Sequence, residues 1–433
     1  MPKKKTALTI EERLQQALVP AEEQPYEVPE NWVWVRLTNI ISLSTGKKDA
    51  NYGSDKGVYP FFTCASEPIA CNDYSFDGES ILVPGNGANV GLVIYYNGKF
   101  EAYQRTYVIQ KSKFNIKFIY YNMLAFWDEH NRNKQYGSAT NYIKLGNFES
   151  YNIALPPLSE QQRIVERIEE LFAKLDEAKE RLQEVADSFA VRKAAILHKA
   201  FTGELTQQWR RENGVSDESW EEKKLGEVGV LERGRSKHRP RNDERLFGGI
   251  YHFIQTGDVA NADMFIEKHS QTLSDFGMQQ SKLFAKNTIC ITIAANIGKV
   301  AILSYDSCFP DSVVGLTTDE KNSYKYVYYY LSTQQKELES KAPATAQKNI
   351  NLKVLNDLDI PLPSLPEQHE IVRLIDDLLA RERAAQQAKE QALASIDLMK
   401  KSILARAFRG ELGTNKASEA STLELLKQVL AEN

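Results

Sequence analysis

The sequence has few of the features that mark secreted, membrane or redox proteins. Among 433 residues there are four cysteines, and no two of them form a CxxC pair: Cys64, Cys71, Cys290 and Cys308. This pattern disfavours zinc or redox use and predicts buried, reduced thiols. No apolar run approaches the roughly 18 residues of a membrane span. The basic start, MPKKK, leads into no apolar signal segment. We therefore expect a cytoplasmic protein that does not contact a membrane.

Signals of catalysis are equally scarce. The six histidines are scattered, and there is no GxSxG motif. The stretch IAANIGKV has Gly-Lys, but it has neither the upstream glycine nor the following Ser or Thr of a phosphate-binding loop. We expect no catalytic site, no metal site and no cofactor in this chain. The formal net charge of −4 argues against a protein that coats nucleic acid, but it leaves room for local basic patches.

A repeat is the strongest feature that is present. LPPLSEQQRIVERIEEL from Leu155 matches LPSLPEQHEIVRLIDDL from Leu362, 207 residues later. The offset continues without a gap to AFTGEL and AFRGEL, and 20 of 51 positions are identical. Such a match indicates a tandem duplication. Ser159–Gln162 and Ser364–Glu367 have the spacing of a helix capping box, so each copy is predicted to begin a helix there.

Each copy is predicted to form a long helix that pairs with the other. Apolar residues recur in alternating steps of four and three, which is a coiled-coil heptad, and no Gly or Pro interrupts the pattern until Gly203 and Gly410. Because the domain between the helices must return the chain, we expect them to be antiparallel. Glu382 and Lys389 interrupt the second seam, so we expect them to face a partner or solvent. The candidate helix-pairing residues are Ile164, Ile168, Leu171, Leu175, Leu182, Val185, Phe189, Ile371, Ile375, Leu378, Ile396, Met399 and Ile403.

The segments before the helices also correspond. NWVWVRL resembles SWEEKKL at an offset of 188, as do Gly46 and Gly234, and ILVPGNGANVGLVI resembles ICITIAANIGKVAI. Both segments are rich in β-branched and aromatic residues, which predicts strand-rich domains. The expected divisions are a tail with a short helix (1–27), a first domain (28–154), a long helix (155–207), a linker (208–219), a second domain (220–361), a second long helix (362–412) and a tail (413–433). The predicted fold is α+β, a pseudo-twofold tandem duplication.

Several polar segments of these domains suit nucleic acid. The clearest is LERGRSKHRPRND, where five basic residues alternate over nine positions and fit a row of phosphates or guanine edges. The polar loops before each long helix offer Asn, Gln, hydroxyl and Lys side chains that read adenine edges or hold phosphates. A solvated loop is the simpler alternative for each segment. The candidate DNA-binding residues are Lys47, Lys48, Asn86, Ser138, Thr140, Asn141, Tyr142, Arg233, Arg235, Lys237, Arg239, Arg241, Gln255, Thr345, Gln347, Lys348 and Asn349.

One alternative belongs to a different class. PDSVVGLTTDEK places Asp311 ahead of Asp319 and Lys321, which loosely resembles a nuclease core in which carboxylates hold Mg²⁺. The pattern is short, and the corresponding FEAYQRTYVI in the first domain lacks it. A metal-dependent nuclease is therefore the weaker hypothesis, and a coiled-coil scaffold without a nucleic-acid role is another.

The two PLPPLxEQxxIV…AFxGEL blocks, each after a strand-rich domain, resemble the specificity subunit of a type I DNA restriction-modification system. The likeness spans roughly residues 28–412, with Ser364 and Pro366 departing from the usual pattern. It implies two target-recognition domains that read a split DNA sequence, with paired helices that set the unread gap and dock partner subunits. Those partners would be methyltransferase subunits, two in number, and restriction subunits. S-adenosylmethionine, ATP and Mg²⁺ would be bound by the partners, and this chain would itself catalyse nothing. A subunit of a methylation-only system is the nearest alternative.

Overall fold

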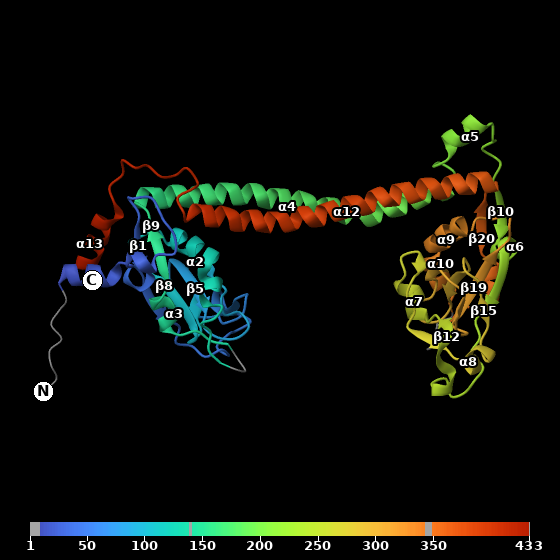
Figure 1. The fold of residues 1–433 in the computed structure, drawn as a ribbon, viewed down its shortest axis with the longest axis horizontal. Coiled ribbons are helices and arrows are strands. Elements are labelled where there is room, and N and C mark those ends of the chain that lie inside the picture. Colours follow the sequence, from blue (N-terminus) through green and yellow to red (C-terminus); the bar gives the residue numbers. More distant parts are fainter. Residues whose placement is uncertain (1–8, 138–140, 343–348, 433) are drawn as a thin grey trace. The chain divides into compact units, whose positions relative to one another are not determined.

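The chain folds into two compact units. In the computed structural model, which describes residues 9–137, 141–342 and 349–432, unit 1 comprises Met1–Leu182 and Gln391–Asn433, and unit 2 comprises Gln183–Glu390. Unit 2 is thus one continuous segment, whereas unit 1 is made from the two ends of the chain. Both units mix helices and strands (Figure 1).

Unit 1 is built around a four-stranded sheet of order β2-β8-β5-β6, with a smaller sheet β4-β3-β7 and the pair β1-β9. Helix α2 packs against β5 and β6. The elements are α1 (Ile10–Ala17), β1 (Val33–Arg36), β2 (Ser42–Thr45), β3 (Tyr59–Phe62), β4 (Ile69–Cys71), β5 (Glu79–Pro84), β6 (Ile94–Asn97), β7 (Glu101–Ala102), β8 (Thr106–Gln110), α2 (Ile116–Asn131), α3 (Leu145–Glu149), β9 (Asn152–Leu155) and the first part of α4 (Leu158–Phe201).

Unit 2 repeats this topology. Its sheets have the orders β11-β19-β16-β17-β13 and β14-β12-β18-β15, with the pair β10-β20. The elements are the last part of α4, α5 (Gln207–Asn213), β10 (Glu221–Lys224), α6 (Leu225–Val228), β11 (Gly229–Arg233), β12 (Phe247–Phe253), α7 (Thr256–Asn261), β13 (Phe265–Ile266), β14 (Gln271–Leu273), α8 (Asp275–Gln279), β15 (Leu283–Phe284), β16 (Ile289–Thr292), β17 (Val300–Leu303), β18 (Ser307–Cys308), β19 (Val313–Thr318), α9 (Tyr324–Thr333), α10 (Gln335–Ser340), α11 (Leu352–Asn356), β20 (Asp359–Leu362) and the first part of α12 (Leu365–Ala407), whose remainder belongs to unit 1. The predicted α+β fold and tandem duplication are confirmed.

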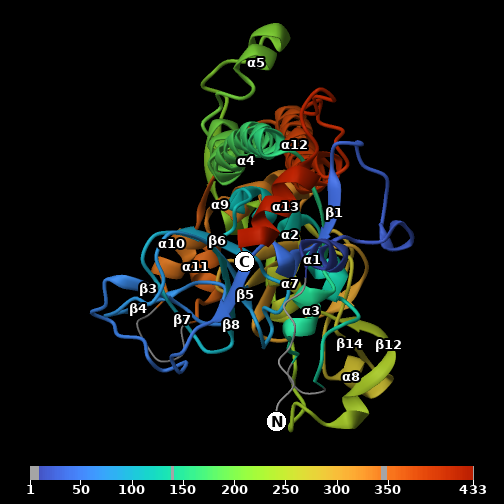
Figure 2. The ribbon, with the colours of Figure 1, turned by 90° about the vertical axis from the view of Figure 1, so that its left-hand side faces the viewer.

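The terminal segments of the chain meet within unit 1. Helix α1 packs against α13 (Thr422–Glu432), as Figure 2 shows, and the Arg13 guanidinium donates to the Leu430 carbonyl at 3.0 Å. Thr9 begins α1 with a capping box, because its hydroxyl accepts from the Glu12 amide and the Glu12 carboxylate accepts from the Thr9 amide. None of the described helices is long and apolar enough to cross a membrane.

The two long helices pair in an antiparallel manner inside each unit. In unit 1, Lys400 of α12 forms an ion pair with Asp176 of α4 at 2.5 Å, whereas Arg163, earlier in α4, reaches the Thr414 carbonyl beyond the end of α12. In unit 2, Arg192 of α4 meets Glu382 of α12 at 2.9 Å. Partner numbers fall as numbers along α4 rise, so the paired helices are antiparallel, as predicted.

The seam residues are placed as follows. Ile164 and Ile168 are buried in the unit 1 core, and Ile371 and Ile375 are buried in the unit 2 core. Leu171, Leu175, Leu182, Phe189, Leu378 and Ile403 are half-buried. The side chain of Val185 lies outside the described part of the structure.

Two expectations about the second helix differ from the structure. Glu382 is half-buried, and both of its carboxylate oxygens accept from the Arg192 guanidinium. It therefore faces α4, and not the partner or solvent that was expected. Met399 is 51% exposed and lies outside the seam, while Ile396 is 5% exposed. The residue after Ile396 that contacts α4 is Lys400, whose ammonium lies 4.9 Å from the Phe172 ring centroid. Lys400 thus takes the place in the seam that was expected for Met399.

Candidate nucleic-acid interface

The basic segment of unit 2 follows β11 and is anchored to the start of β19. The Arg233 guanidinium donates to the Asp311 carbonyl oxygen, and Arg241 forms an ion pair with the Asp311 carboxylate at 3.0 Å. Both arginines are exposed. Asp311 therefore fixes the two ends of the segment, and the alternating row is a shaped loop rather than a free extended ribbon.

The middle of this segment is held by its backbone. The Arg235 amide donates to the Phe309 carbonyl at 3.0 Å, and the Lys237 amide donates to the Gln280 carbonyl at 3.1 Å. Arg239 donates to the Ser236 and His238 carbonyls. The side chains of Arg235 and Lys237 are exposed, so the loop presents two cations on a fixed backbone.

Asp243 braces the far end of the loop. Its carboxylate accepts from the Arg245 guanidinium at 2.7 Å and bonds the His238 ring at 2.8 Å. Hydrogen bonds from Arg245, and after them from His238, hold the pKa of Asp243 well below its usual range. Asp243 therefore stays ionised at neutral pH and keeps a negative charge beside the basic segment.

Unit 1 has a counterpart after β2. Lys47 is exposed, and Lys48 forms a bridge to Tyr103 and places its ammonium 4.0 Å from the Tyr52 ring centroid. A hydrogen bond with Tyr52 raises the pKa of the Lys48 ammonium. The Tyr52 hydroxyl in turn donates to Asp73 at 2.5 Å. The two predicted lysines thus lie on an ordered turn at the edge of the sheet.

Equivalent glycines bring both turns close to the neighbouring strand. The Gly46 amide donates to Thr106 at the start of β8, and the Gly234 amide donates to Val313 at the start of β19. A Cβ on Gly46 would lie 1.8 Å from the Ala102 carbonyl oxygen, and one on Gly234 would lie 2.3 Å from the Pro310 carbonyl oxygen. Only glycine allows this approach.

Gly46→Ala and Gly234→Ala are expected to destabilise the host unit by about 1–3 kcal/mol, because backbone must move to relieve the overlap. Gly146→Ala is the matched control in unit 1, since an added Cβ there meets nothing closer than 4.0 Å and the site is helical. Hydrogen exchange of β8 or β19 peptides measures the effect. Equal protection in Gly46→Ala and Gly146→Ala would contradict the close approach.

The predicted polar loops meet in each unit. In unit 1, Asn86 and Tyr142 form an antiparallel bridge, and the Gly87 amide donates to the Asn141 carbonyl at 2.8 Å. In unit 2, Asn349 forms the corresponding bridge with Ala294. Ser138, Thr140, Thr345, Gln347 and Lys348 lie outside the described residues.

A cavity adjoins these turns in each unit. In unit 1 it has a volume of about 320 Å³, and its lining includes Thr45, Asn86, Gln104, Arg105 and Tyr142. In unit 2 it has a volume of about 590 Å³, and its lining includes Ser236, Arg241, Gln255, Gln271 and Ser312. The Gln255 side-chain amide donates to Gln271 at 2.9 Å. These cavities gather predicted residues with others that the sequence did not single out, namely Gln104, Arg105, Gln271 and Ser312.

The residues of the nuclease hypothesis do not come together. Asp311 precedes β19 and is paired with Arg241, whereas Asp319 follows β19 and accepts from the Lys321 amide and the Asn322 side chain. The six residues of β19 separate the two carboxylates. Throughout the described residues, no group of three or more His, Cys, Asp or Glu side chains lies close enough to hold a metal ion.

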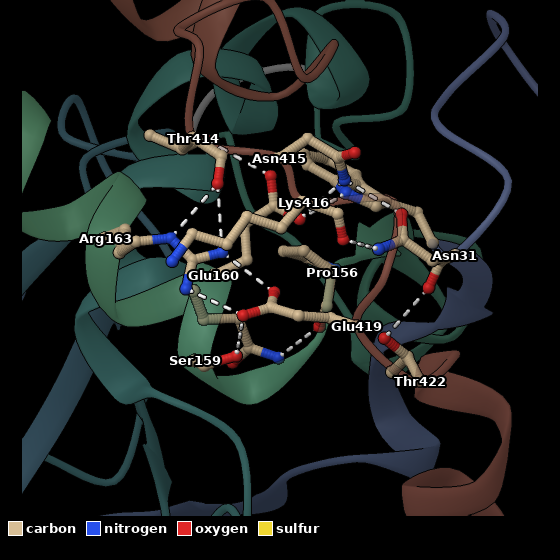
Figure 3. A network of polar contacts seen from close by, with 12 residues as sticks. Asn31, Pro156, Ser159, Glu160, Arg163, Thr414, Asn415, Lys416, Glu419 and Thr422 are labelled. Carbon is tan, nitrogen blue, oxygen red and sulfur yellow. Dashed lines mark hydrogen bonds and ion pairs between the residues drawn. The ribbon is translucent and has the colours of Figure 1, made fainter.

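A buried carboxylate joins the long helix to the domain in each unit. Glu160 lies in the first turn of α4 and accepts from the Trp32 indole at 2.9 Å and from Asn415 at 2.9 Å. Figure 3 shows this network, in which Arg163 also holds Glu419 and the Thr414 carbonyl. The Arg163 guanidinium lowers the pKa of the Glu419 carboxyl. The residues that follow AFRGEL, at the end of the second repeat, thus form hydrogen bonds with the first turns of α4.

Unit 2 repeats the arrangement with the other pair of motifs. Glu367 is fully buried and accepts from the Thr206 hydroxyl at 2.7 Å, the Arg210 guanidinium at 2.7 Å and the Trp220 indole at 3.1 Å. The predicted capping boxes are wrong here: Glu367 binds the residues after AFTGEL, and Ser159 donates to Glu419 instead. In each unit, the buried glutamate at the start of one repeat therefore binds residues that follow the end of the other repeat.

Comparisons with known proteins agree with this duplicated architecture. The family model described as "Type I restriction modification DNA specificity domain" matches residues 29–187 and 217–394. The chain is 30% identical over 436 residues to the type I restriction enzyme EcoDI specificity subunit of Escherichia coli, covering 94% of this chain and 96% of that protein. It is 27% identical to the EcoKI specificity subunit of Escherichia coli strain K12, covering 68% of this chain and 67% of that one. The fold resembles the crystal structure of the HsdS subunit from Thermoanaerobacter tengcongensis, with a TM-score of 0.63, 18% identity and coverage of 90% and 100%.

Proposed function

The chain belongs to the type I restriction-modification DNA specificity family, and from this premise we propose that it reads a two-part DNA sequence, one half with each unit. The observation that carries the proposal is the recurrence of one basic turn in both units. A glycine pressed against the neighbouring strand, a basic turn after it and a cavity beside the turn occur after β2 and again after β11. The two turns are equivalent, and the cavities beside them share the position of Arg105 and Ser312. One such surface in each unit fits one half-site.

The two surfaces differ in the side chains that they present. The unit 1 cavity has Asn86, Arg105 and Tyr142, whereas the unit 2 cavity has Arg241, Gln255 and Gln271. Arginine pairs with guanine edges, and Asn and Gln pair with adenine edges. The half-sites are therefore expected to differ in sequence, so the complete target is asymmetric.

The paired helices are the proposed docking elements for partner subunits and set the unread gap. Val191 on α4 and Leu398 on α12 occupy equivalent positions, 207 residues apart, and both side chains are mostly exposed. Each lies in a different unit, which suits two copies of a methyltransferase subunit. In unit 2 a groove of about 750 Å³ runs beside α4 and includes Leu197, Phe201 and Tyr330.

The chemistry of the complex is assigned to the partners. Methyltransferase subunits bind S-adenosylmethionine and methylate an adenine in each half-site, and restriction subunits use ATP and Mg²⁺. This chain supplies specificity in a cytoplasmic complex. A methylation-only complex would use the same DNA-facing surfaces, so a cleavage assay with the restriction subunit separates the two versions.

The direct test is a map of methylated adenines in DNA from cells that express the chain with its methyltransferase subunit. We expect one two-part motif with a fixed gap. Replacing the domain of unit 2 alone is expected to change one half of the motif. A contiguous motif, or none from a soluble complex, would overturn the proposal.

Single cations on the basic turns are expected to contribute to affinity without affecting assembly. Lys47→Ala and Arg235→Ala are each expected to weaken DNA binding by the complex roughly 3–10-fold and to reduce the salt slope by about one. Arg211→Ala, an exposed arginine on α5, is the control. Fluorescence anisotropy at several salt concentrations measures both quantities, and an unchanged salt slope in Lys47→Ala would count against a phosphate contact.

A further inference from the structure

An exposed aliphatic side chain recurs at one position of both units. Val58 is 79% exposed and Ile250 is 80% exposed, more than Ile69 on the neighbouring strand β4, which is 46% exposed. Val58 immediately precedes β3, and Ile250 lies within β12. These values are the two highest among the exposed large apolar residues of the described chain.

The registers show that the two positions are equivalent. Phe61 of β3 pairs with Ile69 on one side and with Glu101 in parallel on the other. Phe253 of β12 pairs with Gln271 on one side and with Cys308 in parallel on the other. Val58 and Ile250 each stand three residues before these phenylalanines.

A glycine before each aliphatic residue fixes its exposure. A Cβ on Gly57 would lie 2.4 Å from the Cys71 backbone, and one on Gly249 would lie 2.4 Å from the Leu273 carbonyl oxygen. The glycine lets the strand lie tightly on its neighbour, so the next side chain is held away from the core. Recurrence of both residues in two diverged domains argues that the exposed group is used.

The surroundings indicate the occupant. In unit 2, the strand that carries Ile250 also contributes Gly248 and Phe253 to the cavity that holds Arg241 and Gln255. In unit 1, Lys56 lies two residues before Val58, and Tyr59 packs on Tyr74, whose ring centroid is 4.5 Å from the Lys99 ammonium. Cations beside aromatic and apolar groups are typical of nucleic-acid surfaces.

We propose that Val58 and Ile250 are specificity-determining residues that each contact a thymine methyl group in the half-site read by their unit. An aliphatic side chain has no hydrogen-bonding group, and the thymine 5-methyl is the apolar group on the base edges of the major groove. This inference rests on the proposed function and adds a named apolar contact to each half-site.

The test uses the complex of this chain with its methyltransferase subunits and duplexes in which single thymines are replaced by uracil, which lacks the methyl group. For the unaltered complex, one replacement in each half-site is expected to weaken binding roughly 3–10-fold. Val58→Ala is expected to lose the uracil sensitivity of one half-site, and Ile250→Ala that of the other.

The control is Val230→Ala, because Val230 is also well exposed but its equivalent in unit 1 is the polar Ser42. Uracil replacements without effect, sensitivity retained in both variants, or one variant changing both half-sites equally would overturn the inference while leaving two-part recognition standing. Absence of any two-part binding would instead remove the proposed function, and this inference with it.

Discussion

Arg210→Ala is expected to destabilise unit 2 by about 3–5 kcal/mol, because it leaves the Glu367 carboxylate buried without its cationic partner. The side chain of Arg210 is 6% exposed and that of Glu367 is 0% exposed, and their ion pair measures 2.7 Å. The remaining donors, Thr206 and Trp220, are neutral and reach the same oxygen. They satisfy hydrogen bonding at that atom but do not balance the charge.

Local hydrogen exchange is the suitable measurement, since a chain with two units need not unfold in one step. Peptides that cover β10 and β20 are expected to lose protection, and peptides of unit 1 are expected to keep it. Arg211→Ala, the exposed neighbour on α5, is the matched control. Equal protection in the two variants would show that the carboxylate does not depend on Arg210.

Ile396→Ala is expected to destabilise unit 1 by about 2–4 kcal/mol through the cavity that it leaves, whereas Met399→Ala is expected to change stability by less than about 0.5 kcal/mol. The reason is the register of α12, in which Ile396 is buried and Met399 faces outward. Hydrogen exchange of the last three turns of α12 compares the two variants. A larger loss of protection in Met399→Ala than in Ile396→Ala would instead indicate that Met399 packs in the seam, as the strict heptad pattern predicts.

The long helices and the duplication were predictable because 20 of 51 positions are identical at an unbroken offset of 207 residues. Met399 was misplaced because a strict alternation of four and three assumes that every seam position is apolar. Lys400 takes the seam position: its ammonium lies over the Phe172 ring and forms an ion pair with Asp176. Such amphipathic burial of lysine is invisible to a pattern that counts only apolar residues.

The candidate interface was predictable in outline but not in its internal contacts. A row of alternating cations identified the loop after β11, yet its anchor, Asp311, is 70 residues from Arg241 in sequence. That contact exists because β11 and β19 pair in the sheet. Gln104 and Arg105 were missed, although the 207-residue offset aligns Gln104 with Asp311 and points to the same corner of the sheet.

The discontinuity of unit 1 has a consequence for the newly made chain on the ribosome. Unit 2 has all its residues once Glu390 is synthesised, but unit 1 must wait for Gln391–Asn433. At ~5–20 residues per second, these 43 residues take roughly 2–9 seconds to appear. Until then Ile164 and Ile168 lack Leu404, Ala407 and Phe408, with which they share a core. The domain that is translated first is therefore the one completed last.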